Sequence, residues 1–274
     1  HFAFVLQDPN AALMQCRQEL KHLQRLRHPN IVRLIASCDN EQSLVTEYCS
    51  RGSLADVLSA EEKSLDALKW TLLAHVAAAL EFLHTRKPAV VHRDVKTSSV
   101  LVTGDWTAKL ADFGMARLQI RASGLLTTTS NAGTIAFQAP EQFRLATSAE
   151  LSKELSKESS QRTAVGTPAD IYAFACVALH VLTGRPPFHG CSQARIIADK
   201  LAKRKPPPEL RQLDQASDEA AFLTHCFAYA PSNRPTANAV LDFCRARQAR
   251  VQLCPKRARS LSDGPVPVPA SVDI

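Results

Sequence analysis

The sequence lacks several features that would mark a membrane, zinc-binding or secreted protein. Its longest apolar run, residues 171–183, is too short to span a bilayer and contains His180. No signal peptide is visible at the start of the chain. The eight cysteines form no Cys-x-x-Cys pair, which argues against a zinc site and favours reduced thiols. We therefore expect a cytoplasmic protein with no membrane segment in this chain.

Glycine is also scarce, and one basic segment has no acidic residue at all. None of the nine glycines forms a Gly-x-Gly-x-x-Gly loop. Between Arg245 and Arg259 the chain has six Lys or Arg residues and no Asp or Glu, so much of the net charge of +7 lies there. No aromatic residue interleaves with these charges, which makes nucleic acid a poor candidate partner. The chain begins with His1 rather than Met, and we expect it to be an N-terminally truncated fragment.

Two acids flank a short predicted hairpin in the middle of the chain. The apolar runs 100–102 and 109–111 are joined by a Thr-Gly-Asp turn, which is typical of a hairpin. Asp94 lies in the loop before the first run, and Asp112 directly follows the second. One carboxylate could accept a proton from a hydroxyl, and the other could hold a hard cation. Lys96 adds a positive charge suited to a phosphoryl group in transfer. These residues predict one shared site.

Three motifs in order carry a resemblance to a known family. They are His-Arg-Asp-x-Lys at residues 92–96, Asp-Phe-Gly at 112–114 and Ala-Pro-Glu at 139–141. Together they resemble the signature set of protein kinases, and the likeness extends over about residues 2–248. The Gly-Ser-Leu phrase after residue 51 and the Thr-Ser phrase after Lys96 are most similar to tyrosine-kinase-like serine/threonine kinases. The residues alone would also fit an acid-bearing hairpin in another α/β domain.

The resemblance implies an α+β, bilobal fold with a partial β-rich small lobe and a mainly helical large lobe. Its expected parts are an incomplete small lobe at 1–48, a large lobe at 49–248, a surface insertion at about 144–166, and a basic, then Pro/Ser-rich, disordered tail at 249–274. Apolar periodicity predicts helices at 11–26, 54–58, 68–84, 171–182, 194–204, 218–228 and 236–245. Strands are expected at 1–7, after the break at residues 27–30, and at 43–49.

The resemblance also assigns the chemistry of the central site. It implies that Asp94 orients the substrate hydroxyl and accepts its proton, while Lys96 steadies the phosphoryl group from Mg-ATP. Asp112 would hold Mg²⁺. Ser99 stands where the family has Asn, and we expect it to be a weaker second ligand to the metal and nucleotide. In serine/threonine kinases the Thr at the position of Thr134 bonds the catalytic Asp and this Lys, here Asp94 and Lys96, and tyrosine kinases usually lack that Lys. The implied substrate is therefore a protein Ser or Thr.

The expected ATP contacts come from the first part of the chain. Glu19 matches the helix residue that pairs with the ATP-anchoring Lys of a small-lobe strand. Val5 occupies the position expected for that Lys, unless the Lys lies upstream. By resemblance to the kinase hinge, Thr46 takes the gatekeeper position, and the backbone groups of Glu47 and Cys49 bind the adenine edge. An ordinary edge strand would fit the same residues.

The polar stretch after the Asp-Phe-Gly motif resembles an activation segment. Thr127, Thr128, Thr129 and Ser130 stand at its centre. A phosphate on one of these hydroxyls could be bound bidentately by the guanidinium of Arg93. A Ser/Thr loop without modification is the alternative.

Three further expectations concern the large-lobe core. We expect Asp170, at the start of the uncharged helix, to support the backbone of the catalytic loop. We expect Glu141 to form a buried ion pair with Arg234 of the Ser-Asn-Arg-Pro phrase. The resemblance also implies a stack of side chains that runs from the small lobe to this helix, made of Leu23, Leu34, His92 and Phe113.

A pseudokinase is the rival interpretation from another functional class. Val5 and Ser99 favour a scaffold or regulator with weak or no catalysis, because each replaces a residue that the family uses for ATP or metal. The retained Asp94, Lys96 and Asp112 favour the enzyme, as does Glu19.

Overall fold

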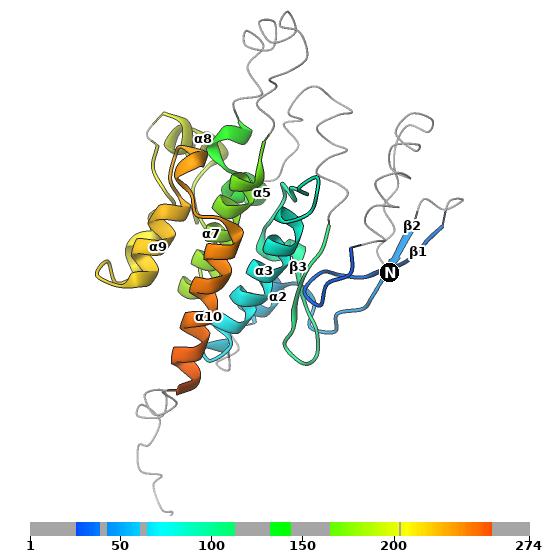
Figure 1. Cartoon of the computed structure of the whole chain (residues 1–274). Coiled ribbons are helices and arrows are strands. Elements are labelled where there is room, and N and C mark those ends of the chain that lie inside the picture. Colours follow the sequence, from blue (N-terminus) through cyan, green and yellow to red (C-terminus); the bar gives the residue numbers. More distant parts are fainter. Residues whose placement is uncertain are drawn as a thin grey trace, which may run out of the picture.

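The computed structural model describes residues 26–38, 43–60, 65–112, 132–143, 165–202 and 204–253 (Figure 1). Within these ranges a mainly helical body carries two small antiparallel sheets. The elements in chain order are β1 (Leu34–Cys38), β2 (Ser43–Thr46), α2 (Leu54–Ser59), α3 (Lys69–His84), η2 (Thr97–Ser99), β3 (Val100–Val102), β4 (Ala108–Leu110), α5 (Ala132–Phe137), η3 (Pro140–Gln142), α7 (Thr167–Thr183), α8 (Gln193–Leu201), η5 (Pro208–Gln212), α9 (Asp218–Cys226), η6 (Pro231–Asn233) and α10 (Ala237–Leu253).

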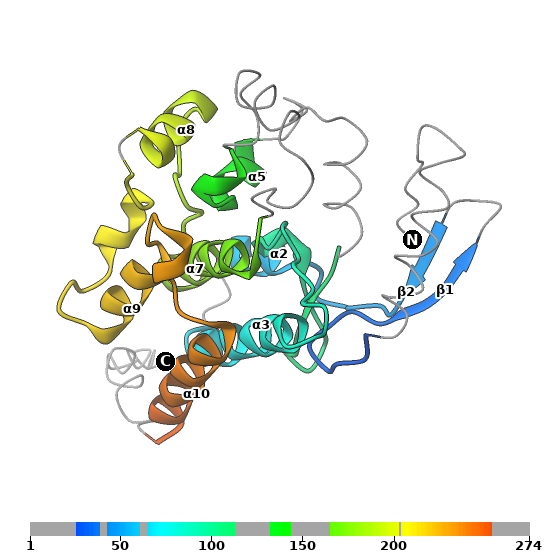
Figure 2. The ribbon, with the colours of Figure 1, turned by 45° about the horizontal axis from the view of Figure 1, so that its top comes forward.

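The two sheets differ in how they pack against the helical body. β1 and β2 form an antiparallel pair that projects from one side of the helices (Figures 1 and 2). β3 and β4 form the predicted hairpin, with Val100 opposite Leu110 and Val102 opposite Ala108. The side chains of Val100, Val102, Ala108 and Leu110 are all fully buried. The hairpin therefore belongs to the core, whereas β1 and β2 leave Ile35 and Val45 exposed.

Backbone hydrogen bonds join the hairpin to the segments before it. The Val32 amide donates to Leu110 O at 2.9 Å, and the Leu110 amide donates to Asn30 O at 2.8 Å. On the other edge of the hairpin, the Arg51 amide donates to Val102 O at 3.1 Å. Both edges of this two-stranded unit are therefore paired, as buried backbone groups require.

Helix α7 is the centre of the helical body (Figure 2). Every residue from 169 to 181 is buried, as its uncharged sequence predicts. Helix α3 lies on one side of α7 and buries the predicted face, which consists of Leu72, Leu73, Val76, Leu80 and Leu83. Helix α10 packs along α3, and the Gln248 side chain donates to Thr71 Oγ1 at 3.1 Å. These contacts confirm the helices predicted near 68–84, 171–182 and 236–245 and place α7 under the central site. The strand predicted at 1–7 and nearly all of the helix predicted at 11–26 lie outside the described residues.

Several element ends differ from the predicted ranges. Ser53 caps α2 as expected, because its Oγ accepts from the Asp56 amide and the Asp56 carboxylate accepts in return. Helix α10 continues to Leu253, well past the predicted end at residue 245, so residues 249–253 are helical and the predicted start of the disordered tail at residue 249 is wrong. Helix α5 was not predicted at all. In the described residues no helix is both long and apolar enough to cross a membrane. The mixed architecture agrees with the α+β class.

Candidate active site

A buried carboxylate of α7 holds the loop that carries Asp94. The amides of His92 and Arg93 donate to the two oxygens of Asp170, at 2.9 Å and 2.8 Å. The His84 ring donates from Nε2 to Asp170 Oδ2, also at 2.9 Å. The Asp170 side chain has no exposed surface. A buried charge with three donors is well compensated, so it fixes the backbone that leads into Asp94. The predicted support of this loop by Asp170 is confirmed.

The same loop is hydrogen-bonded to Ala111, which lies between the end of β4 and Asp112. The His92 ring donates from Nε2 to Ala111 O at 2.8 Å, and its Nδ1 accepts from the Asp94 amide at 3.3 Å. The Ala111 amide donates to Ser99 O at 2.8 Å. The hairpin and the loop thus bring the two acids to one place, as the sequence predicts.

Two residues of this site have backbone conformations that non-glycine residues rarely adopt. Arg93 has φ of 70°, and Asp112 has φ of 63°. Such positive φ values cost free energy and persist only where the surrounding contacts enforce them. Arg93 directly precedes Asp94 in the chain, and Asp112 lies two residues after the end of β4. The surrounding contacts therefore hold this region in a costly conformation, which is common at functional sites.

Asp94 is paired with a cation that also reaches α5. Lys96 Nζ lies 2.7 Å from Asp94 Oδ2, and both side chains are about one-fifth exposed. Lys96 Nζ also donates to Thr134 Oγ1 at 3.4 Å. Among the described residues Thr134 contacts Lys96 and not Asp94. Of the two predicted contacts of Thr134, the one with Lys96 is therefore present. The carboxylate and the ammonium are both open to a reactant.

Asp112 supplies the carboxylate that a hard cation requires. Desolvation raises the pKa of Asp112 above its usual value, His92 and Lys96 lower it, and Asp94 raises it again. The described part of the chain gathers no group of three or more His, Cys, Asp or Glu into a metal cage. A single carboxylate fits Mg²⁺, which usually keeps water and binds substrate phosphates. Mg²⁺ is therefore compatible with the donors present.

Ser99 lies differently from what the predicted metal role requires. Its Oγ donates towards Asp94 O at 2.9 Å and Lys96 O at 3.0 Å, and it accepts from the Lys96 amide at 3.0 Å. The residue is fully buried. The hydroxyl therefore closes the turn of the loop on itself. Its roles towards metal and nucleotide stay predictions, and they would require the side chain to leave these contacts.

The predicted hinge residues follow β2. The Glu47 amide donates to Arg33 O at 3.0 Å, and Glu47 Oε1 accepts from the Arg33 amide at 2.7 Å. Oε1 also lies 3.0 Å from Nζ of Lys109, on β4. Thr46 is exposed and Cys49 is buried. The Glu47–Lys109 ion pair thus ties the hinge segment to the hairpin beside Asp112, a link that sequence reasoning missed.

Comparison with known proteins shows which family the chain belongs to. The chain matches the protein kinase domain over residues 5–243, which is most of its length. The chain belongs to the protein kinase family. It is 34% identical over 233 residues to the serine/threonine-protein kinase CTR1 of Arabidopsis thaliana, and it is 30% identical over 256 residues to the probable serine/threonine-protein kinase drkD of Dictyostelium discoideum. The predicted resemblance and the bilobal kinase fold are confirmed.

These relatives are much longer proteins. The alignments cover 83% and 92% of this chain but only 26% of CTR1 and 18% of drkD. U-box domain-containing protein 70 of Oryza sativa subsp. japonica is 35% identical over 182 residues, which is 63% of this chain and 20% of that protein. The chain therefore spans about a quarter or less of the length of these relatives.

The kinase domain also contains the predicted ion pair between Glu141 and Arg234. Arg234 Nη1 and Nη2 contact the two oxygens of Glu141 at 2.7 Å and 2.8 Å, a bidentate geometry. The guanidinium also donates to Ala228 O and Pro168 O. The Arg234 side chain has no exposed surface, while that of Glu141 is 21% exposed. The pairing is confirmed.

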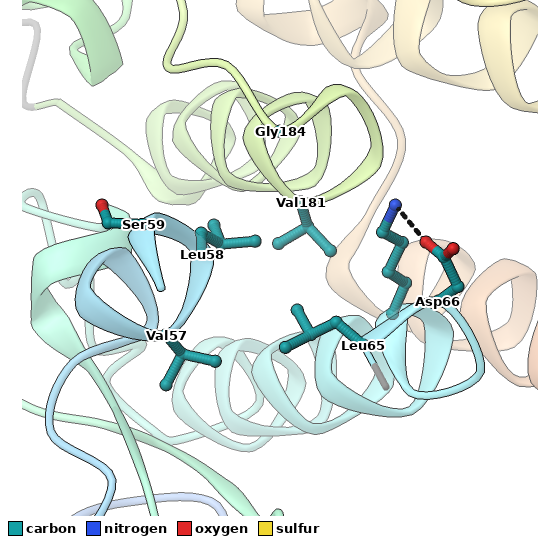
Figure 3. Close-up of a pocket in the computed structure, with 8 residues that line it drawn as sticks. Val57, Leu58, Ser59, Leu65, Asp66, Val181 and Gly184 are labelled. Atoms are coloured by element: carbon teal, nitrogen blue, oxygen red, sulfur yellow. Dashed lines mark ion pairs between the residues drawn. The ribbon is translucent and has the colours of Figure 1, made fainter. Parts of the chain in front are cut away.

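A cavity of about 370 Å³ lies between α2, α3 and α7 (Figure 3). Val57, Leu65 and Val181 line it, and the Asp66–Lys69 ion pair of 2.8 Å lies at one side. None of its lining residues carries the predicted chemistry, so it is not the site built above.

Several predicted residues of the kinase site lie outside the described residues, and their roles stay predictions. Leu34 is only half-buried, while His92 is fully buried at its place in the predicted stack. The predicted residues outside the description are Val5, Glu19, Leu23, Phe113, Thr127, Thr128, Thr129 and Ser130.

Proposed function

We propose that this kinase domain transfers the γ-phosphoryl group of ATP to Ser and Thr hydroxyls of proteins. The observation that carries the proposal is the contact of 2.7 Å between Asp94 and Lys96 on a loop that Asp170 anchors. The contact between Lys96 and Thr134 supports a Ser or Thr substrate. The names of CTR1 and drkD agree with this choice.

Each acid would have a separate task in the transfer. Asp94 would orient the substrate hydroxyl and accept its proton, because it is the carboxylate beside the open ammonium of Lys96. Lys96 would then compensate charge that develops on the transferred group. Asp112 would hold Mg²⁺, which, with ATP, supplies the phosphoryl donor and neutralises its phosphates.

The nucleotide would lie between the hinge and the hairpin. The Glu47–Lys109 ion pair supports this placement because it holds the hinge backbone against β4, next to Asp112. The backbone groups of Glu47 and Cys49 would bind the adenine edge, with Thr46 beside it. Glu19 would position the ATP-anchoring Lys.

Regulation and cellular context follow from the same proposal. Arg93 would receive a phosphate placed on one of the hydroxyls at residues 127–130, which would order the activation segment. Cys49, Cys176, Cys226 and Cys244 are free and buried, which supports a reducing, cytoplasmic compartment. A protein kinase of this kind would act in signalling. The kinase domain would comprise residues 1–248 and the rest of α10 to Leu253, with an insertion at about 144–166 and a tail after Leu253. Val165 is buried in the core, so the insertion would end before it.

The experiment is to incubate the full-length protein with Mg-ATP and dephosphorylated casein, and to map the phosphates by mass spectrometry. We expect phosphate on Ser and Thr but not on Tyr, and none with the Asp94→Ala variant. Phosphate on Tyr, or no excess over Asp94→Ala, would contradict the proposal.

A scaffold without catalysis is the second candidate, and the buried hydroxyl of Ser99 favours it. A scaffold that binds ATP without metal should be stabilised equally by ATP in Mg²⁺ and in EDTA, because bound ligand raises the melting temperature by mass action. The enzyme should need Mg²⁺ for this stabilisation, and Asp112→Asn should remove the dependence. Thermal shift measurements with both proteins separate the two candidates.

A further inference from the structure

Lys200, near the end of α8, has no exposed surface, and its side chain reaches the segment at residues 135–138 beside the catalytic loop. Lys200 Nζ donates to Ile135 O at 2.9 Å, to Ala136 O at 2.8 Å and to Gln138 O at 2.5 Å. An ammonium has three donors and no acceptor, so these three carbonyls satisfy it completely. Helix α8 lies next to α5 in both views (Figures 1 and 2). Lys200 thus joins the two elements by charged hydrogen bonds.

Aromatic rings complete the surroundings of this ammonium. Nζ lies 5.1 Å from the ring centroids of Tyr172 and Phe188, and 5.7 Å from that of Phe143. These distances are within the range at which a ring face attracts a cation, and the attraction is stronger for a desolvated cation. The described residues include no carboxylate in an ion pair with Lys200, and both oxygens of the nearby Glu141 contact Arg234. Carbonyls and rings therefore stabilise the charge.

Burial on this scale is costly for a lysine. Desolvation lowers the pKa of Lys200 to about 7, although Cys176 and Glu141 favour the charged form. The Cys176 thiol donates to Ala136 O as well, at 3.6 Å, and burial raises its pKa to about 12, so it keeps its proton. A methionine or leucine would fill the same space at α8 without the desolvation cost. What such a residue could not do is hold the three carbonyls.

The segment that Lys200 holds contacts the catalytic loop at two points. Before the held carbonyls, Thr134 Oγ1 accepts from Lys96 Nζ. After them, Gln142 Nε2 donates to Arg93 O at 3.1 Å, and Gln142 Oε1 accepts from the Ala139 amide at 2.7 Å. The segment whose middle Lys200 fixes therefore adjoins the loop that carries Asp94.

We propose that Lys200 is a positioning residue for the protein substrate: its ammonium fixes residues 135–138, and through them places Thr134 and Gln142 against the catalytic loop. The inference rests on the proposed kinase function. It concerns how the protein substrate is docked, and not how ATP is bound, because none of the held groups belongs to the hinge or to Asp112.

The first test needs no catalytic activity. Hydrogen exchange of the full-length protein is followed by mass spectrometry in the parent, Lys200→Met and Lys200→Arg. Lys200→Met should speed exchange of the amides at 134–139 by about tenfold or more, while amides in the middle of α7 keep their parental rates. Lys200→Arg should slow the exchange again, because the guanidinium restores charged donors. Arg195→Ala, on the exposed side of α8, is the matched control and should change neither segment.

The second test is kinetic and uses dephosphorylated casein and Mg-ATP. Lys200→Met should raise KM for casein by about tenfold, with KM for ATP unchanged, because only substrate docking is affected. A loss of general stability would instead speed exchange in α7 by the same factor, and this result would overturn the proposal. Unchanged exchange at 134–139 in Lys200→Met would also overturn it.

Two outcomes need separate handling. If Lys200→Met does not give soluble protein, Lys200→Gln keeps two N–H donors without the charge, and the same comparison with Lys200→Arg applies. If the parent transfers no phosphate at all, the proposed function fails, and the exchange measurement alone decides whether Lys200 fixes the segment.

Discussion

Two buried charges of opposite sign hold the two segments that meet at Asp94. The Asp170 carboxylate accepts from backbone amides of the catalytic loop, and the Lys200 ammonium donates to backbone carbonyls at 135–138. Each side chain is fully buried; Asp170 binds loop backbone, whereas Lys200 binds carbonyls at the C-terminal end of α5 and at Gln138. Asp170 also has a side-chain partner in His84, whereas the partners of Lys200 among the described residues are carbonyls and rings.

The difference shows how each segment depends on its anchor. The catalytic loop has further contacts of its own, through His92 to Ala111 and through Ser99 to the loop backbone. The segment at 135–138 depends more heavily on one side chain. We therefore expect loss of Asp170 to affect the whole fold, and loss of Lys200 to affect mainly the segment it holds.

The largest effect is expected from Asp170→Ala. Removal of the carboxylate leaves two buried amides and the His84 ring without their acceptor, which should cost about 5 kcal/mol of unfolding free energy. Urea denaturation measures this change. Asp170→Asn keeps one carbonyl oxygen and should lose less. An Asp170→Ala protein as stable as the parent would show that the loop does not depend on this anchor.

A smaller effect is expected from Glu141→Ala. Arg234 would remain fully buried without its carboxylate, although its bonds to Ala228 O and Pro168 O persist, so about 3 kcal/mol should be lost. The same change removes a charge that favours the ammonium of Lys200, so exchange at 134–139 should also rise. Glu141→Gln serves as the control of similar shape. Melting at the parental temperature would refute the importance of the pair.

A pH-dependent effect is expected at the other end of α7. His180 Nδ1 lies 3.2 Å from Thr97 Oγ1 of the catalytic loop, and burial lowers the pKa of His180 to about 4. An unfolded histidine binds its proton near pH 6.5, so between these values the unfolded chain binds more protons and stability falls as the pH falls. From pH 7 to pH 5 the parent should lose about 2 kcal/mol more than His180→Gln. Equal losses in urea denaturation would contradict the buried, neutral histidine.

The sequence predicts the role of Asp170 but not that of Lys200, because only Asp170 has a local sequence pattern that indicates its role. Asp170 begins an uncharged helix and follows a recognisable set of motifs, so its role could be inferred from position alone. Lys200 lies near the end of an amphipathic helix, where a lysine is normally solvated. Its acceptors are 62 to 65 residues away in the chain, and no local pattern indicates them.

Other features of the structure also fall into those that the sequence predicts and those that it does not. The hairpin, the uncharged helix and the Glu141–Arg234 pair follow from apolar runs and motifs. The Glu47–Lys109 pair joins residues 62 apart, and the extension of α10 to Leu253 accompanies contacts of Arg247 with Asp218 and Glu219. Such tertiary contacts decide element ends and charge partners, and periodicity contains no information on them. Helix α5 is short and holds a glycine, which a sequence reading takes as loop.

The central claim is that Asp94 acts as the general base in phosphoryl transfer, in a loop where Ser99 takes the place of Asn. Single-turnover transfer from Mg-ATP by the full-length protein tests it directly, with the parent, Asp94→Ala and Ser99→Asn measured side by side. The parent should exceed Asp94→Ala by about 10²–10⁴-fold, because a positioned general base contributes that much. Ser99→Asn should gain about tenfold, or ~1.4 kcal/mol of transition-state stabilisation. A parent rate equal to that of Asp94→Ala, and not raised by Ser99→Asn, would contradict the enzyme and leave the scaffold.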